Sequence, residues 1–77
     1  MRVANRITLT DDERETLERR ARSRMTPVRL VERAKIILWA SEGRMSKWIA
    51  AELQVDRQTV ARWRKRFVAG GLQAIQF

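Results

Sequence analysis

Residues 46–66 read SKWIAAELQVDRQTVARWRKR, a short apolar-periodic run, a break at Gln54 and a longer run rich in arginine and lysine. Helical spacing places one set of apolar side chains along a seam that two short helices can share. The set is Ile49, Ala50, Leu53, Val55, Val60 and Trp63. Asp56 stands where the N-cap of the second helix should be. The stretch therefore predicts helices over 46–53 and 57–68, joined by a tight turn.

The second of these helices separates its apolar and its charged residues by face. Val60, Trp63 and Phe67 fall within about 60° of one another on a helical wheel. The opposite side carries Gln58, Arg62, Lys65 and Arg66. Asp56 is the only acidic residue between positions 53 and 77. A solvated surface helix usually mixes charges of both signs, so we favour a polyanion-binding face over a merely solvated one.

The whole chain is small and strongly basic. It has 77 residues, with 17 Lys plus Arg against 9 Asp plus Glu and a net charge of +8. That excess implies a polyanionic partner, with nucleic acid as the first candidate and an anionic membrane as the second. The chain has no cysteine and no histidine, which excludes disulfides, thiolate zinc sites and a histidine base. No window reaches the roughly 18 apolar residues of a membrane span, and MRVANR lacks an apolar signal region. We therefore expect a soluble, cytoplasmic protein.

Capping signals mark the first two helices. Thr10 and Glu13 form a capping box, with acids in the first turn and arginines in the last, so a helix is predicted over about 11–24. Thr26 as N-cap and Pro27 at the first helical position predict a second helix that runs to about Glu42. Gly43 supplies its C-terminal stop. Residues 1–9 are predicted to form a flexible basic arm, and residues 10–77 the folded domain.

The second helix should be the centre of the core. Its apolar stripe consists of Leu30, Val31, Ala34, Ile37 and Leu38. Ile36 and Trp39 fall outside this stripe, so they either pack on the arm or the tail, or meet a partner surface such as a homodimer. Leu72, Ile75 and Phe77 either fold back on the core or begin a further unit. The predicted fold class is an all-α, four-helix, homeodomain-like helix-turn-helix bundle.

This geometry presents the helix at 57–68 to the major groove of double-stranded DNA. Gln58 has the bidentate amide that suits adenine, and the forks of Arg57 and Arg62 suit guanine. For Arg57, a phosphate contact or a surface ion pair is an equal alternative. Thr59 either binds phosphate or points to solvent. Lys65 and Arg66 lie further along the helix, where backbone phosphates are the expected contacts.

Other basic and aromatic residues have more than one reading. Lys47 at the start of the preceding helix is a plausible phosphate ligand. Trp48 either packs against the second helix or donates its indole N–H to a phosphate. Trp63 is expected in the core, and Arg64 is expected to form a salt bridge to a neighbouring helix. Two arm residues could enter a minor groove or make no fixed contact; they are Arg2 and Arg6.

No residue is assigned to catalysis, to a metal or to a cofactor, and we expect neither enzyme activity nor a small-molecule substrate. One acidic cluster could suggest a metal site: Asp11, Asp12, Glu13 and Glu15. Capping and the helix dipole explain these acids better. A basic amphipathic membrane binder is a third reading, but separate caps and glycine stops favour a globular bundle.

Several runs together resemble a known family. They are RAKIILWASEG at 33–43, IAAELQVDRQTVARWRKRF at 49–67 and GGL at 70–72, with LTDDERETLERRARS at 9–23 fitting as well. They resemble the N-terminal helix-turn-helix of bacterial insertion-sequence transposases of the Tc/mariner superfamily. The resemblance covers about residues 7–75, and its most discriminating part is the RWRKRF-xxGGL extension.

The resemblance implies a role in transposition, a form of DNA recombination. It implies recognition of an element's terminal inverted repeats and a separate RNase-H-like catalytic domain, which 77 residues cannot contain. The alternative is a free-standing transcriptional regulator with the same motif. The chain departs from the family pattern at Gln54, where glycine is common, at Met45, which shifts the capping role to Ser46, and at Trp48.

Overall fold

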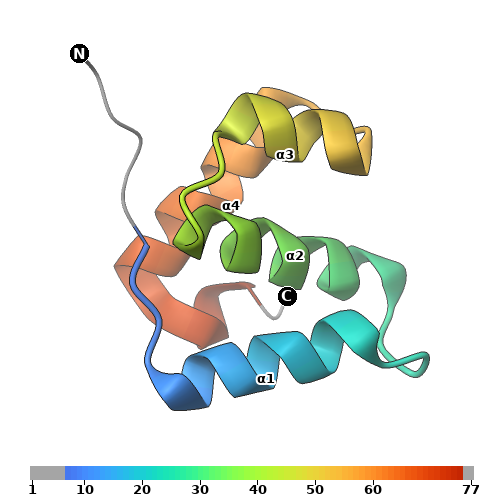
Figure 1. Ribbon diagram of the computed structural model, residues 1–77, viewed down its shortest axis with the longest axis vertical. Coiled ribbons are helices and arrows are strands. Elements are labelled where there is room, and N and C mark those ends of the chain that lie inside the picture. Colours follow the sequence, from blue (N-terminus) through green and yellow to red (C-terminus); the bar gives the residue numbers. More distant parts are fainter. Residues whose placement is uncertain (1–6, 76–77) are drawn as a thin grey trace.

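The computed structural model describes residues 7–75, which form four α-helices and a short 3-10 helix (Figure 1). The elements are α1 (Asp11–Arg22), α2 (Val28–Ser41), α3 (Ser46–Leu53), α4 (Arg57–Gly70) and η1 (Gly71–Ile75). This part of the chain contains no β-strand, and the predicted all-α helix-turn-helix fold is confirmed.

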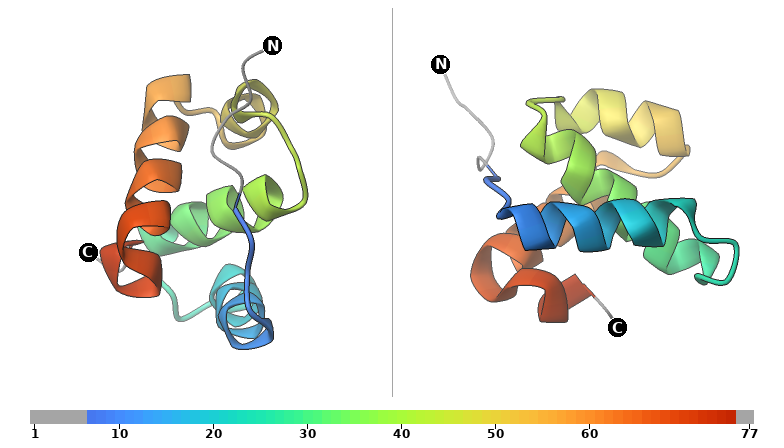
Figure 2. Two further views of the ribbon diagram at one scale, coloured as in Figure 1. Left: turned by 90° about the vertical axis from the view of Figure 1, so that its left-hand side faces the viewer. Right: turned by 60° about the horizontal axis from the view of Figure 1, so that its bottom comes forward.

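The second helix is the centre of the bundle. α1 packs against one side of α2, and α3 lies beyond the other side (Figures 1 and 2). α4 contacts both α2 and α3, and η1 turns back against α4. Because α2 touches three other helices, its position determines how the α3–α4 pair is presented to solvent.

The predicted capping box at the start of α1 is confirmed. The Glu13 amide donates to the Thr10 hydroxyl over 3.1 Å, and the Thr10 amide donates to a Glu13 carboxylate oxygen over 3.0 Å. The helix ends at Arg22, two residues before the predicted end, because Ser23 has an extended backbone. The acids of the first turn thus hold and complement the helix N-terminus.

The N-caps of α2 and α3 are each one residue off the predicted ones, although α3 spans the predicted residues 46–53. Pro27, and not Thr26, is the N-cap of α2, because its backbone is extended (ψ 144°) and its carbonyl accepts from the amides of Leu30 and Val31. Met45 caps α3 without a side-chain hydrogen bond, and Ser46 is already helical. The predicted capping role of Ser46 is therefore wrong.

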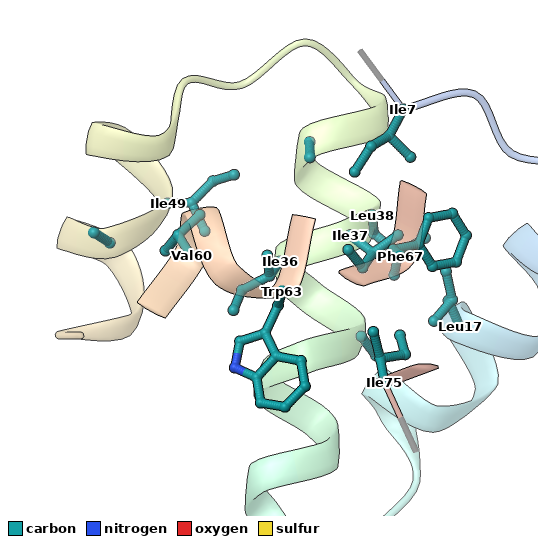
Figure 3. Close-up of a cluster of buried hydrophobic side chains, with 13 residues drawn as sticks. Ile7, Leu17, Ile36, Ile37, Leu38, Ile49, Val60, Trp63, Phe67 and Ile75 are labelled. Carbon is teal, nitrogen blue, oxygen red and sulfur yellow. The ribbon is translucent and has the colours of Figure 1, made fainter. Parts of the chain in front are cut away.

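Ile36 lies in the core, although it falls outside the apolar stripe predicted for the second helix. Ile36 is 1% exposed and lies near Trp63 of α4, whereas Ile37 and Leu38 lie near Phe67 (Figure 3). α2 is covered by α4 on one side and by α1 on another, so its buried arc is wider than one stripe. A homodimer contact through Ile36 is therefore excluded, while Trp39 is half-buried.

Both ends of the described chain contribute to the core. Ile7 is 3% exposed and Leu9 packs against the core, so the last residues of the predicted arm belong to the folded domain. Ile75 is 1% exposed and Leu72 packs against the core, which confirms that the tail folds back. Arg2, Arg6 and Phe77 lie outside the described residues.

Candidate nucleic-acid interface

The turn between α3 and α4 depends on one left-handed residue. Gln54 has φ 58° and ψ 45°, and its amide donates to the carbonyl of Ala50. The amide of Val55 donates to the same carbonyl over 3.0 Å. The position that often holds glycine in such motifs therefore does require a positive φ here, and glutamine adopts it.

Asp56 occupies the predicted N-cap position of α4. Its backbone is extended, and its carbonyl accepts from the amides of Thr59 and Val60 over 3.0 and 3.3 Å. Its carboxylate makes no capping hydrogen bond. The backbone of Asp56, rather than its side chain, thus sets the direction in which α4 starts.

The buried face of α4 is the predicted one. Val60 is 0% exposed, Trp63 is 9% exposed and Phe67 is 6% exposed (Figure 3). Trp63 is thereby confirmed as a core residue. Because these three side chains hold α4 against α2 and α3, the opposite face of the helix is fixed toward solvent.

The solvent face carries the predicted contact residues. Exposed side chains there are Arg57, Gln58, Arg62, Lys65 and Arg66, and Lys47 is exposed at the start of α3. Thr59 is half-buried, on the border between the two faces. Gln58 and Arg62 are therefore accessible to solvent, as side chains that contact bases have to be.

Arg66 lies closer to the core than predicted. Its guanidinium carbon is 4.9 Å from the centroid of the Trp63 ring, a cation–π contact. Arg66 follows Trp63 by three residues, so a wheel at about 100° per residue places it about 60° from Trp63. It therefore stands at the edge of the exposed face and not in its centre.

Arg64 is the buried cation of α4. It is 6% exposed, and its guanidinium donates to the carbonyl of Arg44 over 3.3 Å and to the hydroxyl of Ser46 over 3.2 Å. Burial lowers its pKa. Arg64 thus reaches Ser46 of the neighbouring α3, but its contacts with these two partners are hydrogen bonds to neutral oxygens and not the predicted salt bridge.

Trp48 packs against α2, as one of its two readings predicted. Its ring meets the ring of Trp39 edge to face, with centroids 5.1 Å apart and an interplanar angle of 83°. The guanidinium carbon of Arg44 lies 4.5 Å from the centroid of Trp48. Sequence reasoning missed Arg44, because this residue lies in the loop between α2 and α3, where helical spacing gives no signal for a contact with Trp48.

Sequence reasoning also missed two arginines on α2. The guanidinium carbon of Arg33 lies 3.9 Å from the centroid of Trp63, and the side chain donates to the carbonyl of Ile75 over 3.3 Å. The pKa of Arg33 is lowered, first by burial and then by the charges of Arg29 and Arg66, against a smaller opposing effect of Glu32. Arg29 itself is exposed.

Two features often tied to other functions do not occur in residues 7–75. No group of three histidine, cysteine, aspartate or glutamate side chains is close enough to hold a metal ion. None of the helices there has the length and apolar content to cross a bilayer.

Comparison with known proteins gives one match. No curated protein and no solved structure matches the chain. The profile of the family described as winged helix-turn helix matches residues 33–76, from within α2 through α4 and η1. The described part of that stretch holds no strand that would form a wing. Since the match covers more than half of the sequence, the chain belongs to the winged helix-turn helix family, and such a domain suggests DNA binding.

Proposed function

We propose that the chain binds double-stranded DNA sequence-specifically, with α4 in the major groove. The observation that carries this proposal is the division of α4 into two faces. Val60, Trp63 and Phe67 fix one face in the core, and the other presents Gln58 and Arg62 to solvent. An exposed helix of this kind fits the width of the major groove, where each base pair shows a distinct pattern of donors and acceptors.

Two exposed side chains have the chemistry to read bases. The amide of Gln58 can pair with the N6 and N7 positions of adenine, and the fork of Arg62 can pair with O6 and N7 of guanine. The two residues are four apart, so they lie one above the other on the same face of α4. Lys65 lies beside them and supplies a point charge suited to phosphate.

Basic residues in and before α3 are placed to contact the DNA backbone. Lys47 is exposed in the first turn of α3, and Arg44 precedes that helix. Arg57 opens α4 and lies about 140° around the helix from Arg62, away from the base-reading row. We therefore assign phosphate contacts to Lys47, Arg44 and Arg57.

We further propose that this DNA-binding domain is part of a transposase and recognises terminal inverted repeats. The support is the sequence resemblance over about residues 7–75, above all the RWRKRF-xxGGL run. That run forms the end of α4 and the Gly71 turn into η1. A regulator built on the same motif is equally compatible with the fold.

Selection of bound sequences from random duplexes tests both proposals, sequence-specific DNA binding and the role in a transposase. We expect one shared sequence motif. An asymmetric motif bound by one protein molecule supports the transposase proposal. A palindrome with half-sites about 10 base pairs apart, bound by a dimer, would contradict it and support a regulator. The absence of any shared motif would contradict sequence-specific binding.

We propose that the chain by itself binds DNA without cleaving it. Its first-turn acids on α1 serve the capping box, in which Glu13 is held by Thr10. Supercoiled plasmid incubated with the protein and Mg²⁺ or Mn²⁺ should stay intact. Metal-dependent nicking that persists in repeated preparations, and is lost on replacing Asp11 or Asp12 by asparagine, would contradict this assignment.

A further inference from the structure

Two rows of arginines meet at Trp63. Arg29 and Arg33 are four residues apart on α2, and Arg62 and Arg66 are four residues apart on α4, so each pair lies along one side of its helix. The guanidinium carbons of Arg33 and Arg66 lie 3.9 and 4.9 Å from the centroid of the same indole ring. The rows therefore form one continuous basic surface that runs from α2 to α4.

The charges of this surface are not neutralised by acids of the described chain. The one ion pair in residues 7–75 joins Arg19 and Glu15 on α1, at 3.4 Å. Among the four influences on the pKa of Arg33, Glu32 is the one acid, and its effect is smaller than those of burial, Arg29 and Arg66. The guanidinium groups of Arg33 and Arg66 share one ring, and the charge of Arg29 acts on Arg33. These three cations together favour an external anion.

We propose that Arg29, Arg33 and Arg66 form a second phosphate-binding surface that holds the DNA backbone on the α2 side of the groove. This inference rests on the proposed DNA binding and extends it to a helix outside the helix-turn-helix. The occupant is a backbone phosphate of the same duplex that α4 reads.

The geometry around α4 supports this placement. Arg64 reaches the segment before α3, and Arg66 lies about 160° away from Arg64 around the helix, on the side where Arg33 meets Trp63. The buried Arg64 marks the flank of α4 that faces the segment before α3. Arg44 in that segment and Lys47 in the first turn of α3 are exposed, and Arg66 is exposed on the nearly opposite flank of α4. A helix in the major groove has one DNA strand on each flank. The cations on each flank of α4 can therefore contact the phosphates of a different strand.

The start of α2 is close enough to this contact to act on it electrostatically. The charge of Arg29 lowers the pKa of Arg33, whose guanidinium group lies over the Trp63 ring of α4. Arg29 lies in the first turn of α2. Arg62 lies about one helical turn from Arg66, about 6 Å along the axis, so the base-reading face and the α2 surface are neighbours.

The contacts of Arg33 also pre-order it. Stacking on Trp63 and the hydrogen bond to the carbonyl of Ile75 hold the guanidinium group in place before any anion arrives. A side chain that is already ordered loses less conformational entropy on binding. Arg33 can therefore position its charge for phosphate at a smaller entropic cost than a freely rotating arginine.

Arg29→Gln is the cleanest test, because Arg29 is exposed and makes no hydrogen bond or ion pair with the described chain. Binding to the selected duplex and to a scrambled duplex is measured over a range of salt concentrations. We expect weaker binding to both, and a slope of log K against log salt that is smaller in magnitude by about 0.9. Arg19→Gln on α1 removes the same charge elsewhere and should leave the slope unchanged.

Two further measurements sharpen the result. In a second experiment, single phosphates of the duplex are replaced one at a time by neutral methylphosphonates. At one position or more, the replacement should weaken DNA binding by the wild type but not by Arg29→Gln. Arg33→Lys keeps the charge but loses the planar group, so affinity should fall while the slope is retained.

An Arg29→Gln variant with the slope and methylphosphonate profile of the wild type would overturn the α2 surface and leave the proposed function intact. A wild-type chain that binds no duplex would overturn both. A slope loss as large in Arg19→Gln as in Arg29→Gln would show a general charge effect and would also overturn this inference.

Discussion

Gln54 holds a backbone conformation that costs most residues free energy. Its φ of 58° lies in the left-handed region, and its side chain is exposed. For an L-residue this conformation costs roughly 1–2 kcal/mol, which glycine avoids. The α3–α4 turn is therefore formed against a local preference, and the packing of Ile49 and Val60 on its two sides offsets that cost.

Gln54→Gly should stabilise the domain. Relief of the left-handed strain exceeds the added entropy of glycine in the unfolded chain, so the free energy of unfolding should rise by about 0.5–1 kcal/mol. Urea unfolding measures this, with Gln54→Ala as the control that retains the strain. A glycine variant less stable than the alanine variant would contradict the account of this turn.

At the scale of single residues, the helical wheel predicted exposure well. Gln58 and Arg62 are exposed as expected, since the seam fixed by Val60 and Trp63 leaves them outward. It did not predict contacts that depend on a second helix. The stacking of Arg33 on Trp63 joins residues 30 positions apart, and no local pattern contains that distance.

At the scale of elements, the end of α4 depends on its C-cap residue, Gly71, which other residues cannot easily replace. Gly71 has φ 69° and ψ −154°, a region populated almost only by glycine. This conformation turns the chain from α4 into η1, which places Ile75 in the core at 1% exposure. The sequence predicted an end of this helix at about residue 68, two residues before the observed end at Gly70, but not that the tail would form a further helical turn.

Gly71→Ala should destabilise the domain by about 1–3 kcal/mol, because an alanine there adopts a strained backbone or lets η1 leave the core. Thermal unfolding measures the loss. Ala69→Ser, at an exposed helical position nearby, should have little effect. Equal stability of Gly71→Ala and the wild type would show that η1 does not depend on this turn.

Arg64 joins α4 to the segment before α3. Arg64→Met keeps most of the buried side-chain volume but removes the hydrogen bonds to the Arg44 carbonyl and the Ser46 hydroxyl. We expect a loss of about 1–3 kcal/mol in the free energy of unfolding, since two part-buried acceptors lose a charged donor. Urea unfolding measures it, and a variant as stable as the wild type would contradict this structural role.

The whole molecule combines a small core with a strongly positive net charge. α2 is central because it is covered by α1, α3 and α4, and this explains why its buried arc is wider than one sequence stripe. The composition predicted a polyanionic partner from the net charge of +8. It could not predict how the cations are divided between α2, α3 and α4, because that division depends on how the helices pack.

Salt dependence tests the electrostatic part of the account at this scale. Seven cations are assigned to phosphates: Arg29, Arg33, Arg44, Lys47, Arg57, Lys65 and Arg66. If each neutralises one phosphate, log K should fall with log salt at a slope of about −6 on duplex DNA. Binding isotherms at several salt concentrations measure the slope. A slope near zero would contradict a phosphate-based interface, whatever the affinity.

Specificity profiles of two alanine variants test the central claim, that the exposed face of α4 reads bases in the major groove. Arg62→Ala and Lys65→Ala remove neighbouring exposed cations, so each lowers the net charge by one unit. Binding of both variants is measured on the selected duplex and on all its single-base substitutions. We predict that Arg62→Ala loses about 1–3 kcal/mol of discrimination at one base position, whereas Lys65→Ala weakens binding to all duplexes alike. Identical profiles for the two variants would contradict the claim.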